Sequence, residues 1–96
     1  MFRTLTLRGT RGSLLWGAGE AAQLPRWALA RDEAGAWTLS AAVERVDRFR
    51  LRQVPLLFQA PRTAKPAGLW CFPVIPQTVQ IDGPTLTAKL GPPEGR

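Results

Sequence analysis

Arginine is the residue type in this sequence best suited to do chemistry, and its spacing along the chain is uneven. Thirteen Lys and Arg residues oppose seven Asp and Glu residues among 96, which gives a formal net charge of +6. A chain with this balance attracts polyanions, and guanidinium groups both match phosphate geometry and stack on bases. The segment 48–65 holds no acid. We predict a nucleic-acid-binding site in it, formed by Arg48, Arg50, Arg52, Arg62 and Lys65.

Three of these arginines alternate along the chain, as side chains on one face of a strand do. Arg48, Arg50 and Arg52 would project from a strand with a repeat of roughly 6.6–6.8 Å, which is commensurate with successive phosphates of an extended single strand. The simpler interpretation is an exposed strand face that charge keeps soluble and protects from edge pairing. No RNP-type aromatic pair, zinc finger or helix-turn-helix pattern accompanies the arginines, so their spacing alone supports the prediction.

Two tryptophans are candidate contact residues for bases or for a partner protein. Trp70 lies two residues before Phe72, so the two rings would share one face of a strand, and Trp16 stands beside a glycine-rich stretch. Exposed rings form stacking platforms for bases or hot spots of protein interfaces. The competing interpretation is core packing, because a chain of this length has few large aromatic residues to spare.

Residues that could support catalysis are scarce in this sequence. It contains no His, so no side chain has an unperturbed pKa near neutrality. Ser13 and Ser40 have no base in a recognisable motif, and no Cys/His cluster indicates a metal site. Glu44 and Asp47 lie among arginines, where ion pairing is their simplest role. We therefore expect no catalytic residues, no metal and no cofactor, and an enzyme ranks third among the hypotheses.

Protein interaction is the alternative function. The chain would act as an accessory module, a phage or other mobile element being one origin, through an edge strand or an aromatic patch. A homodimer is compatible with this function. No apolar stretch approaches the roughly 20 residues of a membrane span, so we expect no membrane partner and a cytoplasmic location.

Alternation of apolar and polar residues, which is typical of strands, begins near the N-terminus. It predicts strands at 2–8 and 13–16, separated by a glycine-containing turn at 9–12. Residues 18–23 are compatible with a helical turn, which Pro25 would end.

The middle of the chain is expected to form a hairpin and then a long strand. Trp27 and Trp37 lie nearly symmetrically about an Asp-Glu-Ala-Gly loop, so they would face each other across the ladder. Residues 41–52 are interpreted as one strand with a bulge near 45–47, where the apolar parity switches. A helix over 41–47 is the alternative.

These patterns together indicate an all-β fold. We expect a single domain over residues 1–90, followed by a flexible tail at 91–96. Its architecture would be a partly open barrel, SH3-like or OB-like, of six to seven short antiparallel strands with at most one short helical turn. The strands of its second half are expected at 54–60, 69–75, 79–81 and 86–90.

Overall fold

The computed structural model describes residues 5–17, 19–62 and 68–93, and the only helical elements in these ranges are two short 3-10 turns. The all-β fold expected from the sequence is confirmed. The described strands are β1 (Leu5–Trp16), β2 (Gly19–Arg31), β3 (Trp37–Ala42), β4 (Arg45–Val46), β5 (Leu56–Pro61), β6 (Leu69–Val74), β7 (Gln80–Asp82) and β8 (Thr85–Leu90), with turns η1 (Arg50–Arg52) and η2 (Pro76–Thr78).

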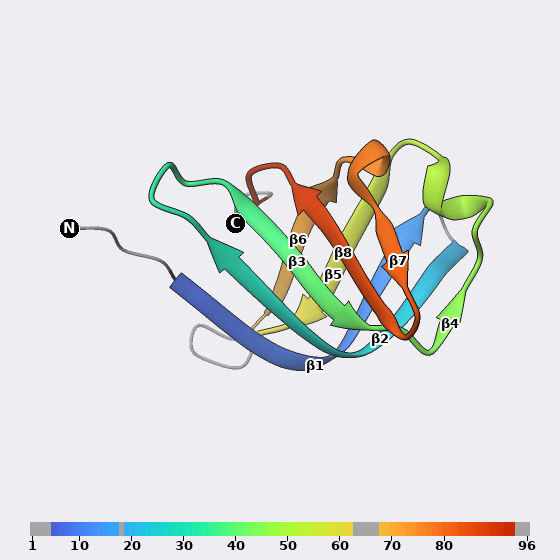
Figure 1. Ribbon diagram of the computed structural model, residues 1–96, viewed down its shortest axis with the longest axis horizontal. Helices are drawn as coiled ribbons and strands as arrows, with labels where there is room; N and C mark the ends of the chain where they lie inside the picture. The colour runs from blue at the N-terminus through green and yellow to red at the C-terminus, as the bar shows by residue number, and fades with distance from the viewer. Residues whose placement is uncertain (1–4, 18, 63–67, 94–96) are drawn as a thin grey trace.

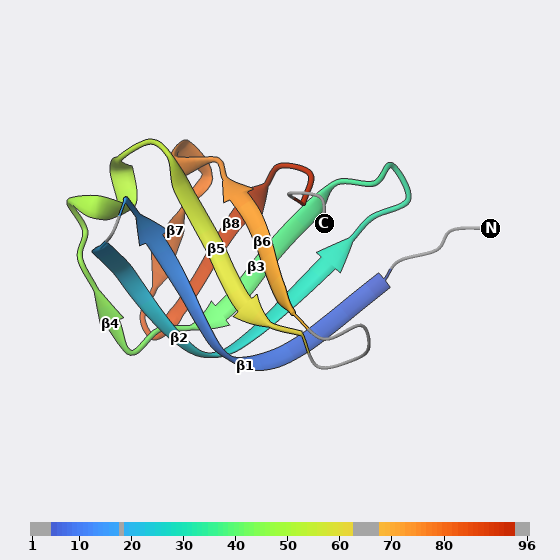
Figure 2. The same cartoon turned by 180° about the vertical axis from the view of Figure 1, so that it is seen from behind.

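Six of these strands close into an antiparallel barrel (Figures 1 and 2). The order is β1-β5-β6-β8-β3-β2, and pairing between β1 and β2 completes the ring. The short strands β4 and β7 are added to the edges of β2 and β8. The seam between β6 and β8 consists of one ladder pair, Val74 with Leu90. The expected antiparallel barrel is therefore confirmed. Of the pairings that close the ring, the one between β6 and β8 has the fewest ladder pairs.

Aromatic rings fill the centre of the barrel. Phe58 of β5 packs edge-on against Trp27 of β2, with 5.4 Å between ring centroids, and lies 6.3 Å from Phe72 of β6. Trp37 of β3 continues the cluster, its centroid 5.1 Å from that of Phe72. All four residues are buried, so one aromatic cluster joins strands from opposite sides of the barrel.

Gly9 and Gly12 make room for the ring of Trp27. A Cβ atom at Gly12 would lie 2.7 Å from that ring, and one at Gly9 would also collide with it. The indole N–H of Trp27 donates to the carbonyl oxygen of Thr10 at 3.1 Å. The turn predicted at 9–12 is therefore wrong, because these glycines lie within β1 and allow a ring to approach its backbone closely.

The long hairpin of β1 and β2 bends at Arg11. No ladder pair joins Arg11 to Pro25, although the residues on either side are paired. Arg11 has a φ of 62°, and Pro25 has no N–H to donate, so the ladder is interrupted where the two strands turn. The bend lets one hairpin contribute to two sides of the barrel (Figure 1). The helical turn predicted at 18–23 is wrong, because β2 begins at Gly19 and pairs with β1.

The hairpin of β2 and β3 is confirmed, but its register differs from the expected one. Trp37 lies opposite Arg31, whereas Trp27 lies further along the ladder, opposite Ala41. The carboxylate of Asp32 accepts two backbone N–H bonds within the loop, each of 2.9 Å, and so holds the turn. The two tryptophans therefore both point into the barrel without facing each other.

The strands predicted for the second half of the chain are confirmed as β5, β6, β7 and β8. Residues 2–4 of the first predicted strand and residues 94–96 of the predicted tail lie outside the described residues. The described part of the tail is hydrogen-bonded to β6 at its first residue. The N–H of Gly91 donates to the carbonyl oxygen of Pro73 at 2.8 Å. In the described ranges the helical elements are turns of three residues, and none of them could span a bilayer.

Candidate functional site

The chain turns sharply after β4, where the sequence predicts a continuing strand. The carboxylate of Asp47 accepts the backbone N–H groups of Phe49 and Arg50 at 3.1 and 3.2 Å. A carboxylate bonded in this way offers the chain a turn in place of a ladder, and Leu51 is buried beneath it. The interpretation of 41–52 as one long strand is therefore wrong.

This turn separates the three arginines that were expected to share a face. With about three residues per turn, alternate side chains no longer point the same way. Arg50 donates to the carbonyl oxygen of Glu20 at 3.1 Å, and its Nε lies 3.5 Å from the carboxylate of Asp47. Arg48 and Arg52 instead line a pocket. The turn thus gives Arg50 a structural role and leaves the other two beside a cavity.

The cavity beside Arg48 and Arg52 lies between η1 and η2, and we call it the turn pocket. Its volume is about 300 Å³, and none of the described residues that line it is acidic. In Figure 1, η1 and η2 lie side by side at the upper right of the barrel. The turn pocket is lined by Arg48, Leu51, Arg52, Pro76, Val79 and Ile81.

The remaining two cations of the predicted site are not brought to this pocket. Arg62 follows the far end of β5, about 20 Å along the strand from Leu56, at roughly 3.3 Å per residue. Its guanidinium carbon lies 4.2 Å from the centroid of the Trp70 ring. Lys65 lies outside the described residues. The structure therefore does not join Arg62 with Arg48 and Arg52 in one surface.

The two tryptophans singled out in the sequence both pack against the core. Trp70 is half-buried, and its ring stacks on Phe72 with 5.8 Å between centroids while Arg62 lies over it. Trp16 is also half-buried against the core cluster. These contacts favour core packing over a bare stacking platform.

A second basic surface covers the outside of strands β1, β2, β3 and β8, and we call it the outer face. Side chains alternate along these strands, so those between the buried positions point outward. This face combines cations with hydroxyl groups and small alanines. Its members are Thr6, Arg8, Thr10, Arg26, Ala28, Ala30, Thr38, Ser40, Ala42, Thr85, Thr87 and Lys89.

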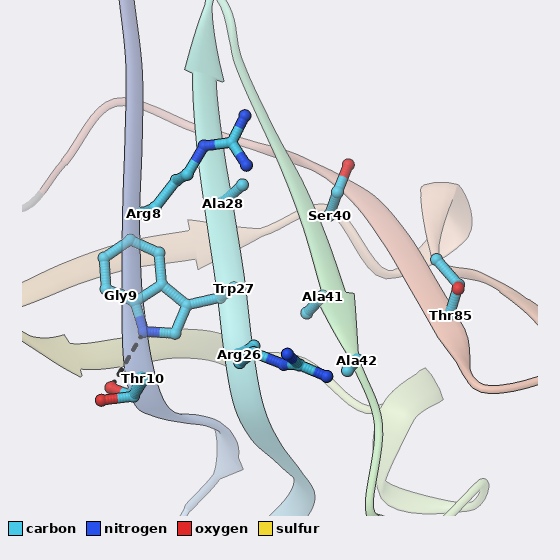
Figure 3. A pocket seen from close by; sticks show the side chains of 10 residues that line it. All are labelled: Arg8, Gly9, Thr10, Arg26, Trp27, Ala28, Ser40, Ala41, Ala42 and Thr85. Carbon is cyan, nitrogen blue, oxygen red and sulfur yellow. Dashed lines mark hydrogen bonds between the residues drawn. The ribbon is translucent and has the colours of Figure 1, made fainter.

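The outer face contains a shallow groove of about 510 Å³, which we call the outer groove (Figure 3). Arg8 lies opposite Ala28 in the ladder, and Arg26 lies opposite Thr10, which makes the two arginines diagonal neighbours. Such neighbours have Cα atoms about 7–8 Å apart. The groove is lined by Arg8, Gly9, Thr10, Arg26, Trp27, Ala28, Ser40, Ala41, Ala42 and Thr85.

The outer groove is hollow because its floor is made of small residues. Ala28 lies beside Arg8 and Ala42 lies beside Arg26, so the backbone is close to the surface next to each arginine. No carboxylate lines the groove in the described part of the chain, where Arg50 with Asp47 is the one ion pair. Arg8 and Arg26 therefore keep their charge available to a ligand.

Sequence reasoning missed the outer groove, although a signal for it was present. Residues 1–31 carry five Arg and one acid, and Thr alternates with Arg from Thr6 to Thr10. The diagonal placement of Arg8 and Arg26 depends on the register of a hairpin that continues through Gly9 and Gly12. A turn predicted at those glycines does not reveal that the two arginines are neighbours.

Carboxylates gather instead on a neighbouring surface. Glu20 accepts from the side chains of Ser13 and Gln23 at 3.2 and 2.9 Å. Together with Glu44 it lines a pocket of about 320 Å³ that Arg11 also borders. The bend at Arg11 thus separates a mixed-charge surface from the purely basic outer groove.

The outer groove and the turn pocket are each lined by two arginines and by no carboxylate among the described residues. Arginine pairs of this kind suit phosphate or carboxylate groups. The chain was also compared with known proteins, and no family model, curated protein or solved structure matches it.

Proposed function

We propose that this protein is a non-catalytic β-barrel that binds nucleic acid through phosphate contacts in the outer groove. The observation that carries the proposal is the lining of the groove, which combines Arg8 and Arg26 with hydroxyl groups and includes no carboxylate among the described residues. Phosphate contacts in protein–DNA complexes come mainly from Arg, Lys, Ser and Thr side chains. The alanine floor lets a phosphate backbone approach the sheet closely.

Hydroxyl groups on both sides of the arginines support the same proposal. Thr10 lies opposite Arg26, and Ser40 lies opposite Ala28 in the next strand pair. Thr85 follows on β8, opposite Ala42. A phosphate bound at either guanidinium group would therefore find hydroxyl donors along the same row of the sheet.

The outer face favours a duplex over a single strand. Proteins that bind single strands without sequence preference use aromatic rings as stacking platforms. Among the described residues, the one aromatic side chain that lines the outer groove is that of Trp27, which is only 3% exposed and so offers no stacking platform. Short side chains on a broad sheet also reach few base edges, so we expect binding with little sequence preference.

A double substitution tests the proposal against the site predicted from the sequence. R8A/R26A and R48A/R52A each remove two positive charges, the first pair from the outer groove and the second from the turn pocket. We expect R8A/R26A to weaken binding of a labelled mixed-sequence DNA duplex much more than R48A/R52A, as measured by fluorescence anisotropy. Equal weakening by the two pairs would show that only net charge matters and would overturn the assignment to the groove.

Strand addition to a partner protein is a second candidate function, and the edge of β1 favours it. β1 pairs with β5 only from Ser13 to Trp16, so residues 5–12 have β2 as their one ladder partner among the described strands. Exposed strand edges accept extended peptides. Leu5 on this edge is 41% exposed. A protein partner retained after nuclease treatment and lost when Thr6 is replaced by Pro would favour this function over nucleic-acid binding.

A further inference from the structure

We propose that the turn pocket binds a small amphipathic anion, with a carboxylate or phosphate group between Arg48 and Arg52 and an apolar body against the pocket floor. This site is separate from the outer groove and does not depend on nucleic-acid binding. The proposal follows from the lining of the pocket, its charge and the way its walls are held.

The floor of the turn pocket is apolar. Leu51 is 3% exposed, and Val79 and Ile81 pack against the core from the other side. Pro76 of η2 completes the wall. A volume of about 300 Å³ accommodates roughly ten water-sized groups, at about 30 Å³ each. A short acyl chain with its head group has about that many heavy atoms.

The two arginines at the rim of the turn pocket favour a negatively charged ligand. Arg48 and Arg52 both line it, and neither has a carboxylate within ion-pair distance among residues 5–17, 19–62 and 68–93. The nearest acid in sequence is Asp47, whose oxygens are occupied by two backbone N–H groups of the turn and by Arg50. An anion at the rim would therefore meet two guanidinium groups with no competing carboxylate.

Both walls of the pocket are held in place by hydrogen bonds. On one side, the N–H of Leu51 donates to the carbonyl of Asp47 at 3.1 Å, and Arg50 ties the turn to β2. On the other side, the hydroxyl of Thr78 donates to the carbonyl of Ile75 at 2.7 Å and accepts the N–H of Lys89 at 2.8 Å. A pocket held in this way loses little conformational freedom when a ligand enters.

Four probes that differ in one property each test the ligand class. Octanoate and octyl phosphate carry both a charge and an apolar chain, octanamide keeps the chain without the charge, and acetate keeps the charge without the chain. Binding to the full chain is followed by ¹H–¹⁵N NMR shifts of Leu51, Val79 and Ile81. We expect octanoate, octyl phosphate or both to bind at least about tenfold more tightly than either octanamide or acetate, since hydrogen bonds to charged groups are worth more than neutral ones. The tighter of the two anionic amphiphiles identifies the preferred head group.

Single substitutions locate the site. Arg48→Gln and Arg52→Gln should each weaken binding of the preferred anionic amphiphile by about tenfold, because each removes one charged donor. Arg45→Gln is the matched control, since Arg45 is an exposed arginine of the neighbouring β4 that does not line the turn pocket. A dispersed NMR spectrum of each variant confirms that it is folded. Equal binding of octanamide, shifts confined to other strands, or equal loss in the Arg45 variant would each overturn the proposal. DNA binding is not a readout here, so this proposal and the nucleic-acid proposal fail separately.

Discussion

The salt dependence of duplex binding is the sharpest consequence of the outer groove. Arg8, Arg26 and Lys89 are the cations of the outer face, so we expect about three phosphate contacts. Each contact contributes about −0.9 to the slope of log affinity against log salt, which gives a slope of about −2.7. Raising the salt fourfold, from about 50 to about 200 mM, should then reduce the affinity about 40-fold.

The double substitution R8A/R26A changes this slope by a defined amount. One cation of the outer face, Lys89, is left, so the slope should fall to about −0.9 and the same salt step should reduce the affinity only about 3.5-fold. Fluorescence anisotropy with a labelled duplex at several salt concentrations gives both slopes. A wild-type slope near zero would refute phosphate binding. An unchanged slope in the double variant would place the phosphate contacts elsewhere on the molecule.

Three further predictions concern the elements that position the two sites. Gly12→Ala places a Cβ atom 2.7 Å from the ring of Trp27, so thermal unfolding should show a loss of about 1–3 kcal/mol and a midpoint lower by roughly 4–8 °C per kcal/mol. Phe58→Ala removes the ring that contacts both Trp27 and Phe72, and should cost about 3–5 kcal/mol in denaturant titrations. Asp47→Ala removes the carboxylate that holds η1, at a cost of about 1 kcal/mol, and should weaken octanoate binding while DNA binding is retained. A full-strength octanoate response in that variant would show that the turn holds without its carboxylate.

Local alternation was sufficient to predict most strands of this protein but not their pairing. The strands of the second half follow from residues such as Leu86, Ala88 and Leu90, whose period of two is a local property. The positions of Gly9 and Gly12 could not be interpreted locally, because their role depends on a tryptophan that reaches them from another strand. The sequence alone does not distinguish a glycine that leaves room for an aromatic ring from a glycine that forms a turn.

The candidate sites show the same division. The prediction that basic residues near 48–52 border a binding surface remains a prediction, but their common face depended on a strand that does not form there. One carboxylate, that of Asp47, bonds to the backbone ahead of it and converts alternating arginines into a turn. At such a point the strand and the turn differ in free energy by about 1 kcal/mol. A pattern of alternating residues does not predict so small a difference.

The sequence by itself determined the β-rich character of this protein, its positive charge and its lack of histidine chemistry, because these follow from composition and from a period of two. Only the tertiary structure decided which arginines lie side by side. Arg8 and Arg26 are far apart in the chain and become neighbours through the register of the β1–β2 hairpin. Arg50, which alternates with Arg48 and Arg52, is directed away from both by the turn at Asp47. The physical reason is that convergence of charges depends on pairing and on turns, whose energies come from contacts between distant segments.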